Sequence, residues 1–209
     1  MFNWYDLPTY YDVSFSYEMS DELAFLKEVF KKYSNSPQPK LLEPACGTGR
    51  LMIPLVREGF DCSGFDINRN ALLYLEKKLD RNQLHANVFY GDMINFKTNE
   101  KYDGIYCTVD TFRHLLTEKK VKQHLVCVIK ALKKNGIYVL GLHLLSNEKK
   151  IDRLTRWTSK RGRLTIKTIM SMIKLDKNKR RETLEVELKI KTKGCNNSYT
   201  SIYQLRTYT

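Results

Sequence analysis

Apolar and polar residues follow two different rhythms along the chain, and the rhythm changes near residue 147. Before that point, short apolar runs alternate with longer amphipathic stretches. The apolar runs predict strands at residues 40–44, 61–67, 87–92, 102–110 and 137–145. The amphipathic stretches predict helices at residues 49–59, 68–83 and 117–136. This alternation indicates right-handed βαβ units, and therefore an α/β fold with a doubly wound parallel sheet.

Local signals predict where three of these helices begin, end or bend. Asn68 has the side chain of a helix N-cap, and Gly136 is a suitable residue to end the helix at 117–136. Pro54 lies about one turn into the helix at 49–59, where we expect it to cause local strain.

The residues after 147 predict an antiparallel β meander. Residues 164–176, 181–192 and 198–208 read as strands, several with apolar and polar residues in alternation, and residues 177–180 and 193–197 are turn-like. We expect this region to form a separate lobe or cap. The predicted organisation is therefore an N-terminal aromatic segment and helix (1–37), an α/β core (38–146) and a basic antiparallel β lobe (147–209).

The N-terminal segment is too aromatic for a disordered tail. We expect it to pack on the body or to fold over a site. Its aromatic residues are Phe2, Trp4, Tyr5, Tyr10, Tyr11, Phe15 and Tyr17. Ser20 is a predicted N-cap for the helix that follows. The apolar face predicted for that helix consists of Leu23, Leu26, Phe30 and Tyr33.

Composition and charge narrow the class of protein. No stretch approaches 18 apolar residues, so we expect no membrane span. The acidic, aromatic N-terminus differs from a secretory signal, and five cysteines without a C-x-x-C pair suit neither a disulfide framework nor a zinc site. We therefore expect a cytoplasmic protein that binds no metal. Residues 147–209 hold 17 basic and 6 acidic side chains, against 19 and 17 before them. This basic region fits either a polyanion such as nucleic acid or a solvated lysine surface.

A glycine-rich turn and two acids fall at successive predicted strand ends. The turn Glu43-Pro-Ala-Cys-Gly47-Thr-Gly49 joins the first strand to its helix, where an open parallel sheet binds its ligands. Asp66 ends the second strand, 19 residues beyond Gly47, where an acid can accept both hydroxyls of a ribose. Asp92 ends the third. The pattern has no third glycine of G-x-G-x-x-G and no P-loop, and an acid at Glu43 suits a cationic cofactor better than a pyrophosphate.

These residues resemble the class I S-adenosylmethionine-dependent methyltransferases. The resemblance covers roughly residues 38–145 and rests on EPACGTG (43–49), GFDI (64–67), GDM (91–93) and YDGIYCTVDTF (102–112). It implies a Rossmann-like, class I methyltransferase fold with S-adenosylmethionine as cofactor and S-adenosylhomocysteine as product. By this resemblance, the cofactor-binding residues are Glu43, Ala45, Gly47, Gly49, Asp66, Ile67, Asp92, Met93 and Thr108. Glu43 to Gly49 would line the methionine moiety, Asp66 would hold the ribose, and Ile67, Asp92 and Met93 would contact the adenine.

Each assignment has a simpler structural alternative. Asp66 could cap the following helix, Asp92 could serve only a turn, and Asp110 could cap a short helical turn. Gly47 and Gly49 could serve only the turn. Four features occur in the order and spacing of the family. It is therefore less probable that all of these simpler roles hold at once than that any single one does.

The methyl acceptor is harder to predict. The resemblance implies an in-line displacement that needs a base only if the acceptor must lose a proton, and the candidates are Asp110, His114 and Tyr11. The chain has Cys107-Thr-Val-Asp in place of an Asn/Asp-Pro-Pro-Tyr element, and Cys107 lacks a preceding proline. Both absences favour a small-molecule acceptor. Trp157 and Arg161-Gly162 fall where a cover over the site would begin, and Tyr5, Tyr10 and Tyr11 could close the other side.

Two other functions remain open from the sequence. The basic region 147–209 could bind RNA for an RNA methyltransferase, with Tyr199, Tyr203 and Tyr208 stacking on bases. Alternatively, the chain could bind S-adenosylmethionine without turnover. The family's sheet usually has seven strands, and no helix leads from the meander into a sixth and seventh. We therefore expect an incomplete sheet with an exposed edge or a shortened chain, and an open edge could support a homodimer.

Overall fold

The protein contains two β-sheets, one parallel and one antiparallel. The computed structural model of the chain describes residues 3–15, 19–34, 36–145 and 154–209. Five parallel strands form the first sheet, in the order β3-β2-β1-β4-β5. They are β1 (Lys40–Pro44), β2 (Asp61–Asp66), β3 (Asn87–Tyr90), β4 (Tyr102–Cys107) and β5 (Leu132–Leu140). The predicted doubly wound parallel sheet is therefore confirmed.

Helices cover both faces of the parallel sheet. Leu41, Cys62 and Tyr106 on one face pack in a core cluster with three helices: α2 (Ser20–Tyr33), α3 (Met52–Arg57) and α4 (Arg69–Arg81). On the opposite face, Leu42 and Ile105 pack against α5 (Glu118–Ala131). Because successive residues of a strand point to opposite faces, the central strands β1 and β4, which are covered on both sides, carry adjacent buried apolar residues such as Leu41 and Leu42. None of the helices in the described residues is long and apolar enough to cross a membrane.

Two of the predicted helix details are wrong. Helix α3 begins at Met52, so Pro54 lies within its first turn, where a missing N–H costs nothing. Helix α5 ends at Ala131 rather than Gly136, and the backbone continues directly into β5. Gly136 is instead needed because a Cβ there would lie 3.0 Å from the carbonyl oxygen of Tyr102 on the neighbouring strand.

The predicted cap of α4 is confirmed, whereas for α2 the predicted Ser20 cap and the burial of Tyr33 are wrong. The Asn68 side chain accepts a hydrogen bond from the Ala71 N–H at 3.1 Å and caps α4, as predicted. Helix α2 starts at Ser20 itself, with Met19 in the cap position and no side-chain cap bond. Phe30 is buried in the core, whereas Tyr33 is 54% exposed because it lies in the last turn, beyond the edge of the core.

The second sheet is a four-stranded antiparallel meander in the order β6-β7-β8-β9. Its strands are β6 (Leu154–Arg161), β7 (Leu164–Asp176), β8 (Arg181–Thr192) and β9 (Cys195–Arg206). The last three match predicted strands. Strand β6 has no apolar alternation, because its inward-facing Trp157 and Ser159 make polar contacts to the N-terminal segment. Its strand character therefore leaves no clear trace in the sequence pattern.

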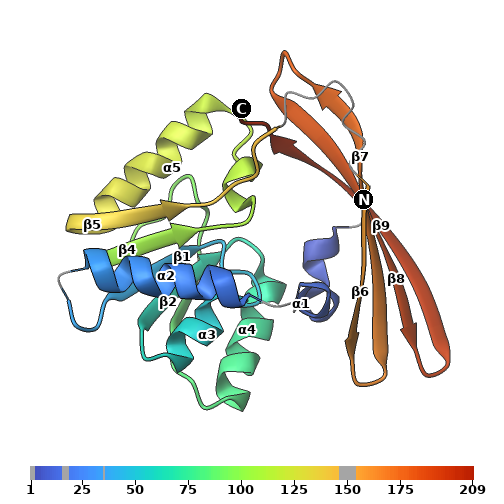
Figure 1. The fold of residues 1–209 in the computed structure, drawn as a ribbon, viewed down its shortest axis with the longest axis horizontal. Helices are drawn as coiled ribbons and strands as arrows, with labels where there is room; N and C mark the ends of the chain where they lie inside the picture. Colours follow the sequence, from blue (N-terminus) through green and yellow to red (C-terminus); the bar gives the residue numbers. More distant parts are fainter. Residues whose placement is uncertain (1–2, 16–18, 35, 146–153) are drawn as a thin grey trace.

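The N-terminal segment lies between the two sheets (Figure 1). It forms a 3-10 turn, η1 (Trp4–Asp6), and a short helix, α1 (Pro8–Ser14). Trp4 and Val13 are buried in a cluster with Ile166, Val186 and Leu188 of the antiparallel sheet. The expectation that this aromatic segment packs on the body is confirmed.

Strand β5 is the edge of the parallel sheet. Within the described residues, no strand pairs with its outer side. Beyond β5, the Leu145 N–H donates to the carbonyl oxygen of Tyr208 at 2.6 Å, so the chain after β9 returns to the parallel-sheet body. This arrangement agrees with the predicted five-stranded sheet with an open edge, and association through that edge stays a prediction.

Candidate functional site

A cavity of about 470 Å³ lies between the carboxyl ends of the parallel strands and the antiparallel sheet. Three parts of the chain form its wall: the N-terminal segment, the strand ends of the parallel sheet and the inner face of the meander. All of the predicted site residues except Gly49 line it: Tyr11, Glu43, Ala45, Gly47, Asp66, Ile67, Asp92, Met93, Thr108, Asp110 and His114. The structure therefore brings together residues that the sequence places up to a hundred positions apart.

The turn between β1 and α3 presents its backbone to the cavity. Ala45 and Gly47 both have positive φ angles, 55° and 53°, which curl the chain tightly after β1. The Gly47 N–H donates to Asp66 Oδ2 at 2.8 Å, which joins this turn to the end of β2. Gly49 is not among the residues that line the cavity, and its contact with a cofactor stays a prediction. A Cβ at Gly49 would lie 2.4 Å from Leu75, so this glycine serves the packing of the turn on α4.

Asp66 is held rigidly at the end of β2. Its Oδ1 accepts the Asn68 N–H at 2.7 Å and its Oδ2 accepts the Gly47 N–H. The side chain is 9% exposed, and burial raises its pKa despite these two backbone donors. Asn68, not Asp66, caps α4, so the alternative role as a helix cap is excluded. The two donors fix the direction of a carboxylate whose remaining lone pairs face the cavity.

The loop after β3 carries Asp92 and Met93. Asp92 does serve its turn, because Oδ1 accepts the Ile94 N–H at 3.1 Å, yet the residue also lines the cavity. The Met93 carbonyl oxygen lies 3.0 Å from His124 Nδ1. A carbonyl oxygen only accepts, so Nδ1 carries a proton. Burial lowers the His124 pKa, and the neutral ring therefore accepts from the Tyr138 hydroxyl through Nε2 at 2.8 Å. This chain of hydrogen bonds fixes the loop from behind.

Glu43 is a carboxyl group with an unusual protonation state. The Tyr106 hydroxyl donates to its Oε2 at 3.0 Å. Burial raises the pKa of Glu43 to about 8, although the nearby Arg50 opposes the shift. Arg50 also lines the cavity and is held by Glu22 through two hydrogen bonds of 2.7 and 3.0 Å. No sequence signal identifies Arg50 as a cavity residue, because a single arginine after a glycine-rich turn has no distinctive spacing.

The loop after β4 is strained where it meets the cavity. Val109 and Asp110 have successive positive φ angles of 50° and 65°, a conformation that costs free energy for residues other than glycine. Asp110 stands before the 3-10 turn η2 (Thr111–His114), but its side chain does not cap that turn. Instead, its carboxylate accepts the His143 N–H at 2.9 Å and lies 3.0 Å from Arg113 Nη1. Burial alone would raise the Asp110 pKa, and these donors lower it.

Arg113 connects this loop to the antiparallel sheet. The side chain is buried, its Nε donates to the Arg206 carbonyl oxygen at 2.9 Å, and Nη2 forms an ion pair with the buried Glu182. One guanidinium therefore holds Asp110, β8 and the end of β9 in a fixed relation. The sequence does not reveal this role, because the three partners are distant along the chain.

Aromatic rings form the wall of the cavity beside His114. The His114 Nε2 lies 3.1 Å from the Tyr5 hydroxyl, and its ring stacks on Tyr203 with centroids 5.7 Å apart. Burial lowers the His114 pKa to about 4, so the imidazole is neutral at physiological pH. Tyr11 packs against Tyr5 and Trp4 at centroid distances of 5.4 and 5.3 Å. The three predicted catalytic candidates thus face one cavity, and Tyr5 joins them.

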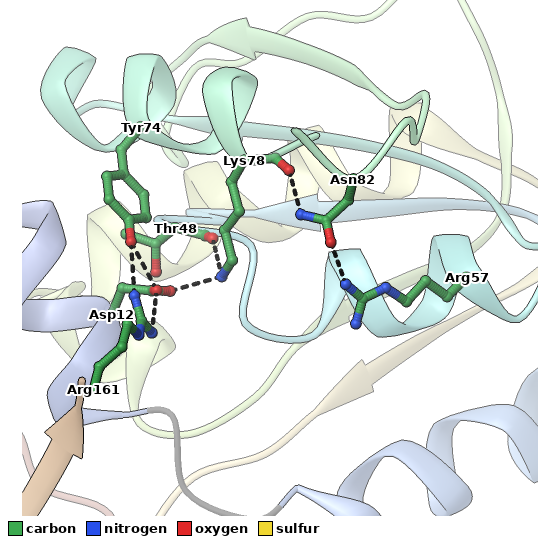
Figure 2. A network of polar contacts seen from close by, with 7 residues as sticks. All are labelled: Asp12, Thr48, Arg57, Tyr74, Lys78, Asn82 and Arg161. Atoms are coloured by element: carbon green, nitrogen blue, oxygen red, sulfur yellow. Dashed lines mark hydrogen bonds and ion pairs between the residues drawn. The ribbon is translucent and has the colours of Figure 1, made fainter. Parts of the chain in front are cut away.

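A polar network anchors the N-terminal helix that carries Tyr11. Figure 2 shows Asp12 of α1 between Lys78 and Tyr74 of α4 and Arg161 of β6. The Asp12 carboxylate lies 2.7 Å from Lys78 Nζ, 2.7 Å from Arg161 Nη2 and 2.9 Å from the Tyr74 hydroxyl. Lys78 also donates to the Thr48 carbonyl oxygen at 3.3 Å. The network therefore joins α1, the α/β core and the antiparallel sheet.

The predicted cover residues act at a distance from the cavity. Trp157 donates from Nε1 to the Ser14 carbonyl oxygen at 2.7 Å, and Arg161 binds Asp12; both hold α1 in place. The meander residues that do line the cavity, besides Tyr203, are Met170, Leu184 and Leu205. Their strands were predicted, but alternation alone does not say which face of a sheet meets a site.

Comparison with known proteins identifies the parallel-sheet body. Residues 41–136 match the model of a family described as a methyltransferase domain. The parallel-sheet body therefore matches a methyltransferase domain over these residues. Its fold is the class I S-adenosylmethionine-dependent fold that the sequence motifs resemble, so that resemblance is confirmed.

Curated relatives resemble the methyltransferase domain at low identity. A protein of Geobacillus sp. (strain WCH70) that carries the name methyltransferase is 27% identical over 120 residues, which cover 57% of this chain and 49% of that protein. The dTDP-3-amino-3,4,6-trideoxy-alpha-D-glucopyranose N,N-dimethyltransferase of Streptomyces venezuelae is 25% identical over 108 residues, 51% of this chain and 44% of that protein. The matched region thus spans about half the length of these relatives.

Solved structures share both the methyltransferase domain and the antiparallel sheet. DesVI of Streptomyces venezuelae superposes with a TM-score of 0.83 at 16% identity, covering 100% of this chain and 85% of its own. The sugar N-methyltransferase KedS8 of Streptoalloteichus sp. ATCC 53650 gives 0.79 at 16% identity, covering 98% and 78%. At this identity, the likeness establishes the fold alone.

Proposed function

We propose that this protein is an S-adenosylmethionine-dependent methyltransferase that transfers a methyl group to a small-molecule amine. The observation that carries the proposal is the single cavity, in which the strand-end acids of the methyltransferase domain and an aromatic wall from two other parts of the chain meet. One end has the groups that recognise a nucleoside with a cationic side chain. The other end is lined by aromatic rings, which orient an acceptor and limit the access of water to methyl transfer from a sulfonium.

The residues at the strand ends fit S-adenosylmethionine. Asp66 presents a fixed carboxylate to the two ribose hydroxyls, and the Gly47 backbone allows close approach beside it. Ile67 is 58% exposed at the end of β2 and offers an apolar surface to the adenine, opposite Met93. Glu43 receives the ammonium group, which would draw its carboxyl into the charged form. The cofactor supplies the activated methyl group, and this chain binds and orients it.

The aromatic end of the cavity orients the acceptor. Thr108, Val109 and Asp110 lie beside the position of the sulfonium, and Tyr5, Tyr11 and His114 form the facing wall. Two of the three candidate bases, His114 and Asp110, hold a proton poorly: burial lowers the His114 pKa to about 4, and donors from His143 and Arg113 lower the Asp110 pKa. A neutral amine can attack through its lone pair without a strong base, whereas most hydroxyls must first lose a proton. This favours an amine, with catalysis by alignment.

The names of solved neighbours point to the same acceptor class. KedS8 is titled a sugar N-methyltransferase, and CalS10 of Micromonospora echinaspora, a structure with S-adenosylmethionine bound, is titled an amino pentose methyltransferase (TM-score 0.76, 17% identity, 100% of this chain and 84% of that one). An amino sugar would place its ring against the tyrosines and its nitrogen beside the methyl group.

The alternative of an RNA acceptor depends on three tyrosines that could stack on bases, and each of them packs against another ring of the protein. Tyr203 stacks on Trp4 and His114, Tyr199 packs on Tyr10, and Tyr208 packs on Phe112. All three rings are half-buried and already packed against other rings of the protein, which leaves them little free surface for stacking on bases.

Calorimetry with S-adenosylhomocysteine tests the cofactor site. We expect micromolar binding by the wild type, and a loss of about a hundredfold in Asp66→Asn because the ribose loses a charged acceptor. The control is Asp61→Asn, an exposed acid at the opposite end of the same strand. Equal binding by Asp66→Asn and Asp61→Asn would contradict the assignment.

A turnover assay separates the enzyme from a cofactor-binding protein. Incubation with methyl-labelled S-adenosylmethionine and a panel of amino sugars, with their hydroxyl analogues as controls, should label only the amines. Tight cofactor binding with no label on any acceptor would favour the catalytically silent alternative.

A further inference from the structure

The antiparallel sheet has one face committed to the protein interior and one face that is open. Ile166, Thr168 and Leu188 point inward and are completely buried against the N-terminal segment. Because side chains alternate along a strand, their neighbours point the other way. Figure 1 shows no described helix on the side of β6–β9 that faces away from α1. This outer face is therefore a surface that the cavity does not use.

The half of the outer face near the β6–β7 and β8–β9 hairpins is strongly basic. Register pairs place twelve of its side chains in three adjacent rows across the four strands. The five cations among them, here named the basic face, are Arg156, Lys160, Lys167, Lys189 and Lys191. Five more are neutral hydrogen-bonding residues: Thr158, Thr165, Asn196, Ser198 and Thr200. The remaining two are Glu187 and Ile169.

The arrangement of these lysines is costly to the fold. Lys167 stands directly opposite Lys189 across the two central strands, and like charges in that position destabilise a sheet. Lys189 has Glu187 at 3.3 Å on its own strand, but within the described residues no carboxylate lies within ion-pair distance of Lys167 or Lys191. Lysines often protect edge strands from aggregation, yet these three lie on central strands, where no edge needs protection.

A ligand with closely spaced negative charges would relieve the uncompensated repulsion between these lysines. Neighbouring strands are about 4.8 Å apart and alternate residues of a strand about 7 Å apart, so the cations form a flat grid. Lysine and arginine with interspersed hydroxyl and amide donors are the side chains that bind phosphate in nucleic acids. Among the described residues of these three rows there is no aromatic ring, and the lone aliphatic side chain, Ile169, is partly covered.

We propose that the basic face binds the phosphate backbone of nucleic acid without reading its bases. The absence of stacking rings from these rows argues against recognition of unpaired bases. No apolar side chain protrudes from these three rows, and in the next row the exposed Leu154 and Ile202 are separated by Ser171 and Glu185; this argues against insertion into a membrane. A second copy of the chain is also disfavoured, because two basic faces repel each other. The proposed contact lies outside the cavity and does not depend on methyl transfer.

The test measures binding of the full chain to a mixed-sequence RNA duplex and to a DNA duplex by fluorescence anisotropy at several salt concentrations. The variant K167Q/K189Q/K191Q removes the central lysines of the basic face. The control K77Q/K97Q/K134Q removes three exposed lysines of the α/β body, with the same change in charge. We expect the first variant to bind at least about tenfold more weakly, with a salt slope shallower by about 3, and the control to bind like the wild type.

Thermal unfolding and two further ligands complete the design. The basic-face variant should be at least as stable as the wild type, because it removes the Lys167–Lys189 repulsion. Equal loss of binding in both variants would show non-specific attraction to total charge and overturn the proposal. It would also be overturned by binding to anionic phospholipid vesicles in place of both duplexes, or by light scattering that shows a dimer lost in the variant. A difference between RNA and DNA would identify the natural partner.

Discussion

Asp12 offers a direct test of how the N-terminal helix is held over the cavity. Its side chain is 4% exposed and accepts from three donors on two other parts of the chain. We consider Asp12→Ala, which leaves the cations of Lys78 and Arg161 without their shared partner. Asp12→Asn, which keeps the shape and loses the charge, should have an intermediate effect.

The expected loss of stability in Asp12→Ala follows from how deeply its ion pairs are buried. Breaking a fully buried ion pair costs about 3–5 kcal/mol. Lys78 and Arg161 retain 28% and 45% side-chain exposure, so water recovers part of that cost. We therefore expect a loss of about 2–3 kcal/mol, which for a chain of this length lowers the Tm by about 5–10 °C. Cofactor affinity should fall too, because α1 carries Tyr11 into the cavity wall.

The assay is thermal unfolding at neutral and acidic pH, with Asp80→Ala as an exposed control on α4. Burial alone would raise the Asp12 pKa, but Lys78 and Arg161 lower it below its ordinary value. A carboxyl with a lowered pKa stabilises the fold above its unfolded pKa, and that stability is lost as the pH falls through the folded pKa. The gap between wild type and Asp12→Ala should therefore narrow in acid. A Tm for Asp12→Ala equal to that of Asp80→Ala at neutral pH would refute the reasoning.

Three further predictions concern the cavity. Affinity for S-adenosylhomocysteine should rise as the pH increases toward 8, because the Glu43 carboxyl ionises near that value and the ammonium group needs it charged; calorimetry of Glu43→Gln should show a flatter profile. Arg113→Lys cannot hold Asp110, β8 and β9 together, so kcat/KM should fall about tenfold to a hundredfold, mainly in kcat, while S-adenosylhomocysteine binding changes little. Finally, the pH profile of kcat/KM should show no inflection from His114 near its ordinary value of 6.5. An inflection there that disappears in His114→Asn would assign it a catalytic proton.

The parallel sheet was predictable because its signals are local. Each strand of the α/β core is a short apolar run, and each strand end carries its own mark, such as the glycine-rich turn or Asp66. These marks converge because parallel strands share one carboxyl edge. Gly49 shows the limit of this reasoning: glycine fits a ligand contact and a close helix contact equally well, and the sequence does not reveal that a Cβ there would lie 2.4 Å from Leu75.

The rest of the site depends on contacts between distant segments. Nothing near Arg113 in the sequence predicts that it will meet Glu182, and nothing near Asp12 predicts Arg161. Helix α5 illustrates a competing signal, because Gly136 reads as a helix end while Leu132 already pairs with Tyr102 in the sheet. Tertiary pairing overrides local preference there.

The aromatic wall has a consequence for how the protein is made. Trp4 stacks on Tyr203, so one side of the cavity is formed by residues that are far apart in the sequence. During synthesis the first residues emerge long before β9 exists, and such long-range contacts form slowly. The parallel-sheet body can assemble while translation continues, but the cavity closes only after β9 has left the ribosome. A nascent chain therefore has no complete site until β9 has been made.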